Sequence, residues 1–215
     1  MNTLDFLLAG IILTALPSGG LYHASARSLC VSDLHLCKSE RIARRTGLMV
    51  PPYETRDTLD RLATDIAATD PAVVICLGDS FDDIAASETL DDACRETLMA
   101  LQAGRDWIWI EGNHDPGPVD LGGTHLAEYR AGGLTYRHIA SAETPEISGH
   151  YHPKIALPGA GAARACFAFD DARCILPAYG TYTGGLRVTD PALRRLFGPR
   201  PHAILTGRRA ILAPF

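Results

Sequence analysis

Four short polar motifs in this sequence contain the side chains that proteins use to bind transition metals. They are Asp33-Leu34-His35, Gly78-Asp79, Gly112-Asn113-His114-Asp115 and Gly149-His150-Tyr151-His152. Carboxylate oxygens and imidazole nitrogens in one site suit Mn, Fe, Zn, Ni or Co. Each motif alone occurs often by chance, and a lone histidine is more often a structural residue than a ligand. The motifs therefore indicate a metal centre if the fold brings all four together.

The elements that must position these motifs are short strands, because an apolar segment precedes each one. Residues 28–32, 73–77 and 107–110 are predicted strands before the first three motifs, and residues 146–149 form one that runs into the fourth. The helices predicted between the first three strands are 57–69 and 87–101. This βαβαβ pattern predicts parallel strands, whose carboxyl ends lie at one edge, where ligands bind in open α/β sheets. We therefore expect the four motifs to converge.

The local backbone at each motif is predicted from its spacing and its glycines. If the chain stays extended after the strand, Asp33 and His35 point the same way, because side chains alternate along extended backbone. The same argument applies to His150 and His152. A glycine before Asp79 allows the backbone to turn sharply there. Both members of each pair are therefore expected to reach one site.

Few helices are predicted in the second half of the chain. The strands predicted there are residues 134–138, 146–149, 163–169 and 174–178. Glycine and proline turns separate them, which favours a more antiparallel half-sheet. A short helix is expected at Asp190 and Pro191, since aspartate caps helices and proline suits the first helical position. Hairpins are predicted within residues 1–16 and at 202–212.

Composition limits the class of protein. The 215 residues are 47% hydrophobic and 21% charged, which fits one soluble globular domain spanning residues 1–215. The net charge of −5 argues against a protein that holds nucleic acid mainly by a strongly basic surface. Local basic clusters occur at Arg41, Arg44 and Arg45, and at Arg194, Arg195, Arg208 and Arg209. Most clusters of this kind are solvated surface.

The cysteines and the chain start bear on the compartment. The six cysteines lack metal-knuckle spacing, so we expect buried thiols and a cytoplasmic location. A disulfide between Cys166 and Cys174 is the less favoured alternative. The apolar start lacks a positively charged region and contains Asp5, which favours a hairpin over a signal peptide. No segment of the sequence approaches the length of a membrane span.

The order of the motifs, with a later histidine before Gly-His-x-His, resembles the calcineurin-like metallophosphoesterase superfamily. Further stretches resemble one subgroup, the bacterial ligase-associated DNA damage response endonucleases called PdeM, over nearly the whole chain. These stretches are residues 34–39, 51–55, 76–81, 149–154 and 176–185. The resemblance implies an α/β fold with two mixed β-sheets packed as a sandwich and flanked by helices. Cys37 departs from the subgroup pattern, and an inert thiol is favoured over a role in metal preference or oxidation.

The resemblance also implies a set of ligands for two divalent ions, with Mn²⁺ expected first and Fe, Zn, Ni or Co as alternatives. The first ion would be bound by Asp33, His35 and His152, Asp79 would bridge, and Asn113 and His150 would bind the second. One more histidine is expected between the third and fourth motifs, where His125 and His138 both lie. We choose His138, because it ends a predicted strand, whereas His125 is expected in a glycine-flanked loop.

Two metals can share a hydroxide and stabilise an in-line phosphoryl transition state, so no protein nucleophile is required. Asp79 and Asn113 are then expected to act in catalysis, and His114 is predicted to contact the phosphoryl or leaving oxygen. Asp115 is expected to orient His114, and Asp82 or Asp83 to orient ligand histidines.

The leading hypothesis is a two-metal phosphodiesterase that acts on DNA, as an endonuclease in repair. A phosphodiesterase or phosphomonoesterase for nucleotides or other small esters is the second, and a non-catalytic interaction module on the same fold is the third. The subgroup's name implies functional association with a DNA ligase and a helicase, and no membrane partner is expected.

Overall fold

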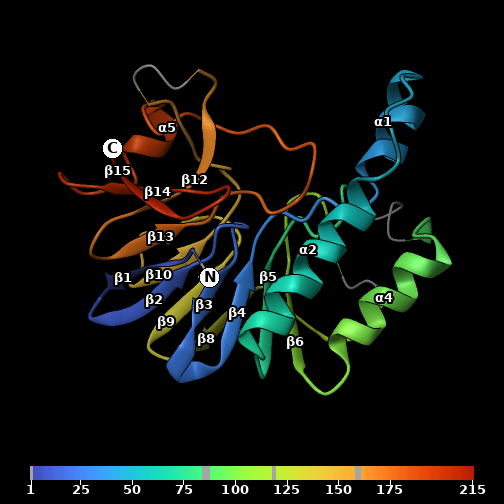
Figure 1. Cartoon of the computed structure of the whole chain (residues 1–215), viewed down its shortest axis with the longest axis horizontal. Helices are drawn as coiled ribbons and strands as arrows, with labels where there is room; N and C mark the ends of the chain where they lie inside the picture. Colours follow the sequence, from blue (N-terminus) through green and yellow to red (C-terminus); the bar gives the residue numbers. More distant parts are fainter. Residues whose placement is uncertain (1, 84–87, 118–119, 158–160) are drawn as a thin grey trace.

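Two β-sheets form the centre of the fold, and two long helices cover the outer face of the first (Figure 1). The computed structural model describes residues 2–83, 88–117, 120–157 and 161–215. Within them the first sheet has seven strands in chain order: β1 (Leu4–Leu8), β2 (Ile11–Ala15), β3 (Leu21–His23), β4 (Ser28–Val31), β5 (Val73–Leu77), β6 (Asp106–Ile110) and β7 (Thr124–Leu126). β1 to β4 are antiparallel neighbours, and β4 to β7 are parallel neighbours.

The second sheet is mixed and is formed by the later half of the chain. In the described ranges its order is β15-β14-β12-β13-β10-β9-β8. The strands are β8 (Glu128–Ala131), β9 (Leu134–Arg137), β10 (Glu146–Ser148), β12 (Arg164–Phe169), β13 (Arg173–Ile175), β14 (His202–Leu205) and β15 (Ile211–Pro214), and β11 (Lys154–Ile155) pairs with β12. The prediction of a more antiparallel half-sheet holds for most pairs, but β10 is parallel to both of its neighbours.

Hydrophobic side chains fill three layers. Phe6, Ile75 and Ile110 of the first sheet share a buried cluster with Tyr136 and Phe167 of the second, so the two sheets pack face to face. On the other face of the first sheet, α2 (Glu54–Thr69) and α4 (Asp92–Gln102) pack on β4, β5 and β6. Those strands are therefore buried on both faces, as the continuous apolar sequence of residues 73–77 predicts for β5. The short helix α5 (Pro191–Arg194) packs on the outer face of the second sheet.

Helix boundaries differ from the predicted ones where local capping decides them. α4 begins at Asp92, and the carboxylate of Asp91 caps it by accepting a hydrogen bond from the Cys94 N–H at 2.8 Å. The predicted start at Ser87 lies outside the described residues. The predicted cap of α5 is confirmed, because the Asp190 side chain accepts from the Ala192 N–H. A further helix, α1 (Lys38–Thr46), was not predicted. Among the described helices none is long and apolar enough to cross a membrane.

Candidate metal centre

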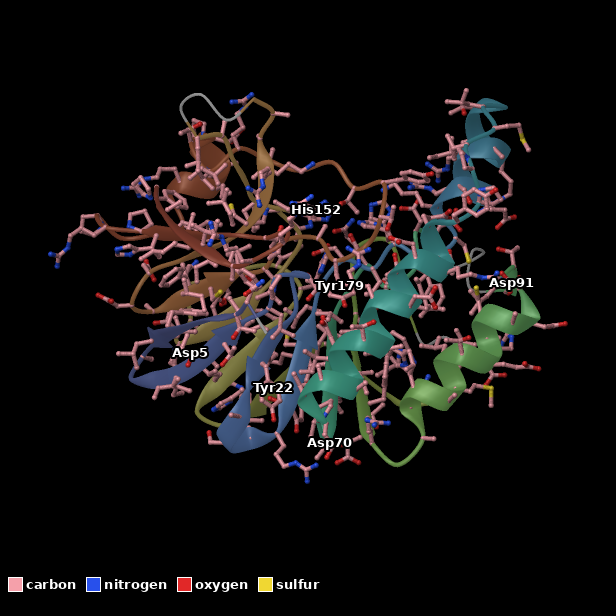
Figure 2. The ribbon with its side chains drawn as sticks, viewed as in Figure 1. Asp5, Tyr22, Asp70, Asp91, His152 and Tyr179 are labelled. Carbon is pink, nitrogen blue, oxygen red and sulfur yellow. The ribbon has the colours of Figure 1, made fainter. Side chains whose placement is uncertain are left out.

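The four motifs lie in loops that follow β4, β5, β6 and β10 at one edge of the molecule. β4, β5 and β6 are parallel, so their carboxyl ends share that edge. The loops are joined by backbone hydrogen bonds, of which one runs from the Asp33 N–H to the Gly78 carbonyl at 3.2 Å. Figure 2 shows His152 near the upper edge of the sheets, whereas Asp70, which precedes β5, lies near the lower edge.

Two groups of metal-binding side chains form at this edge. Cluster A consists of Asp33, His35 and His152, and cluster B consists of Asp79, His138 and His150. Within each cluster the ligand atoms all lie within 4.8 Å of one another. The clusters adjoin, because Asp33 Oδ2 accepts a hydrogen bond from the His150 N–H at 3.0 Å. The fold thus gathers six of the seven side chains that were expected to bind metal.

In cluster A, the two histidines turn their Nε2 atoms toward each other. Nε2 of His35 lies 3.5 Å from Nε2 of His152, which is itself 3.0 Å from Asp33 Oδ1. Nδ1 of His35 lies 2.9 Å from Asp82 Oδ1, and a carboxylate can only accept, so Nδ1 carries the proton. In the neutral ring, Nε2 of His35 therefore presents its lone pair to the cluster. This arrangement fits a divalent cation.

In cluster B, the backbone holds His138 in one tautomer. Nδ1 lies 2.7 Å from the Leu77 carbonyl oxygen, which can only accept, so Nδ1 carries the proton. Nε2 of the neutral ring then faces Asn113 Oδ1 at 3.0 Å and Asp79 Oδ2 at 3.4 Å. Lone pairs that face one another in this way repel unless a proton or a metal cation lies among them. Asn113, the seventh expected ligand, thus lies against cluster B, and the donor set fits a second ion.

The backbone at the ligands is left-handed, so the expectation that the chain stays extended after the strands is wrong. Positive φ angles occur at Asp33 (53°), His35 (44°), Asp79 (46°), His150 (70°) and His152 (45°). A non-glycine residue in this region is uncommon and persists only where the surroundings impose it. Here the loops impose it through mutual hydrogen bonds, such as that from the His35 N–H to the Asp79 carbonyl at 2.9 Å.

Two glycines allow the loops of the centre to approach closely. A Cβ atom on Gly78 would lie 2.6 Å from Nδ1 of His138, and one on Gly112 would collide with the backbone nitrogen of Asp79. Gly78 also has a φ of +74°, as the predicted sharp turn requires. The Gly-Asp and Gly-Asn-His-Asp motifs therefore need glycine both for conformation and for space.

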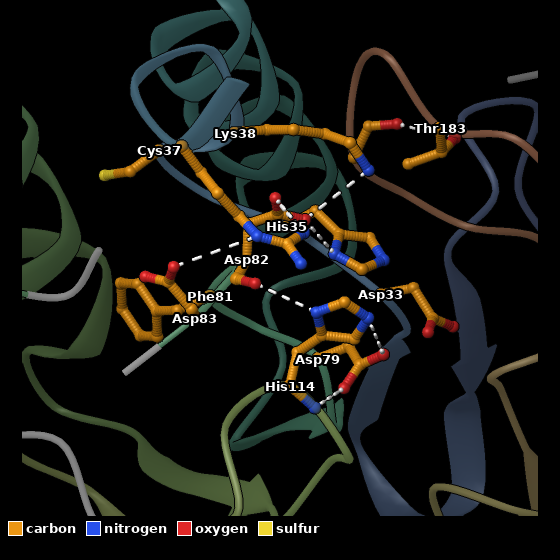
Figure 3. A network of polar contacts seen from close by, with 12 residues as sticks. Asp33, His35, Cys37, Lys38, Asp79, Phe81, Asp82, Asp83, His114 and Thr183 are labelled. Carbon is orange, nitrogen blue, oxygen red and sulfur yellow. Dashed lines mark hydrogen bonds and ion pairs between the residues drawn. The ribbon is translucent and has the colours of Figure 1, made fainter. Parts of the chain in front are cut away.

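Asp82 is the buried carboxylate that joins cluster A to helix α1 (Figure 3). Its Oδ2 lies 2.7 Å from Nη1 of Arg41, and its Oδ1 lies 2.9 Å from His35 Nδ1 and 3.4 Å from Nζ of Lys38. Burial raises the pKa of Asp82, but the hydrogen bonds from His35 and Arg41 and the charge of Lys38 outweigh burial and hold this pKa well below its usual range. The geometry agrees with the predicted role of Asp82. The sequence alone gave no role to Lys38, and it predicted Arg41 only as part of a basic cluster on the surface.

His114 lies beside both clusters, with its ring centroid 5.3 Å from that of His35 in cluster A. Its backbone N–H donates to Asp79 Oδ1 at 2.8 Å, and its ring Nδ1 lies 2.9 Å from the carbonyl oxygen of Asp82. Nε2 is 4.0 Å from Asp79 Oδ2, and the side chain is 30% exposed. One ring nitrogen is therefore held by the backbone, and the other can face a substrate.

The predicted pairing of Asp115 with His114 is wrong. Oδ2 of Asp115 accepts hydrogen bonds from the backbone N–H groups of Ser80 and Phe81 at 2.8 and 3.1 Å. Burial raises the pKa of Asp115 to about 6, against the opposing effect of those hydrogen bonds. Asp115 therefore ties its own loop to the loop after β5, and the Asp82 carbonyl holds His114 in its place.

A comparison with known families identifies the class. Residues 26–162 match the family model described as calcineurin-like phosphoesterase. The chain belongs to the calcineurin-like phosphoesterase family. No curated protein matches it. The solved structure described as the crystal structure of Pseudomonas putida nuclease MPE has a TM-score of 0.78 over 100% of both chains, at 24% sequence identity, and so shares the fold.

These findings confirm the superfamily and the fold that the motifs resemble. The calcineurin-like phosphoesterase family uses divalent metals, and clusters A and B are two places that can hold them. Burial raises the pKa of Asp79, but the hydrogen bond and charge of His138 outweigh it and lower this pKa to about 2. Burial also raises the pKa of Asp33, and His152 outweighs it in the same way. Both carboxylates are therefore ionised at neutral pH, as cation ligands must be.

His125 and Cys37 lie outside both clusters of this phosphoesterase. His125 is in β7 and not in the expected loop, and its ring stacks on Trp109 with centroids 6.2 Å apart. Burial raises the pKa of the Cys37 thiol to about 12, and this agrees with an inert residue. All six cysteines lie in the described part of the chain and are buried and free, including Cys166 and Cys174.

A surface pocket of about 410 Å³ opens beside cluster B. His138 and Asn113 form part of its wall, and Glu111, Glu128 and Arg137 line the rest with neighbouring apolar residues. Arg137 is held in ion pairs with Glu128 and Glu143 at 3.1 and 3.0 Å. The pocket therefore borders cluster B, and no residue of cluster A lines it.

Proposed function

We propose that this protein is a two-metal phosphodiesterase that cleaves DNA as an endonuclease. The observation that carries the proposal is the pair of adjoining clusters whose nitrogen and oxygen lone pairs face inward. Two divalent ions bound there would supply an activated hydroxide and hold the phosphoryl oxygens for in-line displacement. Mn²⁺ is the proposed metal on the resemblance alone, because the mixed imidazole, carboxylate and amide set suits Fe, Zn, Ni or Co as well.

The roles of the chain's own residues follow from their positions. Asp33, His35 and His152 would hold one ion, and Asn113, His138 and His150 the other. Asp79 is proposed to bridge, as the resemblance implies: its carboxylate lies in cluster B, and its carbonyl accepts the His35 N–H beside cluster A. His114 is proposed to donate through Nε2 to a phosphoryl oxygen or to the leaving oxygen in its imidazolium form, since the Nδ1 proton is held by the Asp82 carbonyl.

DNA is the proposed substrate for two reasons. The sequence resembles the ligase-associated endonuclease subgroup over nearly its whole length, and a solved protein of the same fold is described as a nuclease. A role in DNA repair beside a DNA ligase and a helicase, in the cytoplasm, is proposed on the first of these reasons alone.

The test is hydrolysis of bis-p-nitrophenyl phosphate and of single- and double-stranded DNA, with Mn²⁺ and with chelator. We expect metal-dependent cleavage of both substrate classes by the wild type. Asp79→Asn is expected to lower the hydrolysis rate at least about 100-fold, because removing a metal ligand costs more than removing a hydrogen-bond partner of a ligand. His114→Ala is expected to lower the rate about 10²–10⁴-fold, as for loss of a general acid. The control is His202→Ala, which is expected to keep its activity. His202 is exposed, packs on Phe169 and is distant from both clusters in the sequence.

The alternatives predict other results. Cleavage of the small diester alone would replace DNA by small phosphate esters as substrate. No turnover with any metal, and no metal retained after purification, would instead favour a non-catalytic interaction module.

A further inference from the structure

Helix α1 is the basic element nearest to the metal centre. It carries Lys38, Arg41, Arg44 and Arg45 in nine residues, and Figure 1 shows it projecting from the body of the protein beyond α2. The cluster of arginines is evident in the sequence, and the structure shows how each cation is used.

Two of these cations hold the helix in place. Arg41 Nη1 lies 2.7 Å from Asp82 Oδ2, and Arg44 Nη2 lies 3.0 Å from Asp83 Oδ1. Asp82 and Asp83 follow β5 in the loop that also supports His35. Both arginines are therefore engaged in attaching α1 beside cluster A.

Lys38 is a surplus cation beside cluster A. Its Nζ lies 3.4 Å from Asp82 Oδ1, but Asp82 already accepts from His35 at 2.9 Å and is paired with Arg41. Figure 3 shows the Lys38 side chain extended above the His35 ring, and it is 19% exposed. The charge of Lys38 is thus available to an anion that approaches the metal centre, since the 3.4 Å contact with Asp82 is its one ion pair among the described residues.

Arg45 continues the same side of the helix. It lies seven residues after Lys38, which is close to two helical turns and about 10 Å along the axis. The side chain is exposed, and it forms no ion pair with any residue that the structure describes. Lys38 and Arg45 therefore form a line of positive charge that leads outward from cluster A.

We propose that Lys38 and Arg45 bind phosphate groups of a nucleic-acid strand that flank the phosphodiester at the metal centre. This inference rests on the proposed nuclease function and names the surface by which an acidic chain would hold a polyanion. A small diester has no flanking phosphates and cannot use this line of charge. The two residues therefore determine preference for a polymer over a small ester.

The test is binding of a fluorescent oligonucleotide, measured by anisotropy over a range of salt concentrations. The protein carries Mn²⁺ and His114→Ala, which slows cleavage during the measurement. We expect Lys38→Ala and Arg45→Ala each to weaken binding by up to about fivefold, as for a partly screened charge pair. The log–log slope of affinity against salt is expected to become shallower by about 0.7–0.9 for each phosphate that the variant no longer neutralises. Lys38→Arg is expected to restore most of the affinity.

The matched control is Arg195→Ala. Arg195 is exposed at the end of α5, which lies on the opposite side of the molecule from α1 (Figure 1). This change is expected to leave both affinity and salt slope as in the parent. Unchanged affinity and slope in the Lys38→Ala, Arg45→Ala double variant would overturn the inference. Equal loss of activity on DNA and on bis-p-nitrophenyl phosphate in otherwise native protein would also overturn it, because Lys38 would then act on the reacting phosphate. Failure of the wild type to hydrolyse any diester would reject the proposed function instead, while the binding data would still report on the surface.

Discussion

The ring nitrogens of His35 and His138 are assigned by the groups that they face. Each ring donates from Nδ1 to an oxygen outside its cluster and turns Nε2 inward. For His35 that oxygen belongs to a side chain, Asp82, and for His138 it belongs to the backbone of Leu77. Only the first of these contacts can be removed by substitution, so it offers a direct test of how orientation supports metal binding.

Asp82→Asn is expected to weaken binding at cluster A about 10- to 100-fold, because a hydrogen-bond partner of a ligand histidine fixes its tautomer and raises its basicity. Competition with a chromogenic chelator measures the affinity of each ion. Asp83→Asn is the matched control, since Asp83 pairs with Arg41 and Arg44 of α1, and is expected to keep both affinities. Equal losses in the two variants would mean that Asp82 acts through α1 alone.

The choice between His138 and His125 gives a second prediction at this scale. We expect purified His138→Ala to retain about one metal ion fewer than the wild type, because cluster B loses a ligand. His125→Asn is expected to retain the full complement, since His125 stacks on Trp109 in β7. Elemental analysis of the purified proteins measures both, and loss of metal in the His125 variant alone would reverse the assignment.

At the scale of single residues, the sequence predicted which side chains gather and not how the backbone presents them. The spacing of Asp33 and His35 led to the right partners through the wrong geometry, because left-handed φ angles depend on hydrogen bonds between distant loops. Asp115 was misplaced for a similar reason: its partners, Ser80 and Phe81, are more than 30 positions away in the chain.

At the scale of elements, α2 supports the loop of cluster A from behind. Asp65 of α2 accepts hydrogen bonds from Ser18 Oγ at 2.5 Å and from the Tyr179 hydroxyl at 2.8 Å. The Tyr179 N–H in turn donates to the Ser32 carbonyl at 2.8 Å, directly before Asp33. The segment 176–185, which resembles the endonuclease subgroup, thus joins the helix to the metal loop.

Asp65→Asn is expected to change how stability depends on pH. Burial raises the pKa of Asp65 although Ser18 and Tyr179 donate to it, so the folded state holds this proton to higher pH than the unfolded chain does. The group therefore favours folding most at low pH, and that contribution is lost as pH rises through the folded pKa. We therefore expect the free energy of unfolding of the wild type, minus that of Asp65→Asn, to be larger at pH 4 than at pH 7. Urea unfolding with chelator present measures this difference.

The control for this experiment is Asp60→Asn on the exposed side of α2. It is expected to show the same pH dependence as the wild type. A pH-independent difference between the wild type and Asp65→Asn would show that burial of Asp65 does not perturb its titration.

Element positions in the first half were predictable because each strand is a short apolar segment followed by a polar motif, and β5 begins and ends as expected. The start of α4, the helix before β6, was harder to predict, since its cap at Asp91 depends on local hydrogen bonds more than on the periodicity of apolar residues. His125 was assigned to a loop because flanking glycines mask a three-residue strand, which exists through its parallel pairing with β6.

At the scale of the whole molecule, both clusters take ligands from both sheets. In cluster A, Asp33 and His35 follow β4 of the first sheet, whereas His152 follows β10 of the second. In cluster B, Asp79 follows β5, whereas His138 and His150 come from the second sheet. A bound ion would therefore hold the two sheets together at this edge. The periodicity of the sequence indicated the strands, but only the resemblance indicated that they form two packed sheets.

Removal of metal is expected to lower the melting temperature. A ligand that binds only the folded state stabilises it by about 2.7 kcal/mol when its concentration is 100 times its dissociation constant. Calorimetry of the metal-loaded and chelated protein measures the difference. His150→Ala, which removes a ligand of cluster B, is expected to show a smaller difference than the wild type. Identical melting temperatures with and without chelator would contradict the proposed link between the sheets.

The division of ligands between sheets is also a division along the chain, since the two histidines that face each other in cluster A are 117 positions apart. A break in the chain between β7 and β8 would leave Asp33, His35 and Asp79 on one fragment and the other three histidines on its complement. Neither fragment could form a whole site alone. Recovery of metal binding after mixing would therefore report reassembly of the two pieces, and the protein could serve as a split reporter whose signal is phosphoester hydrolysis.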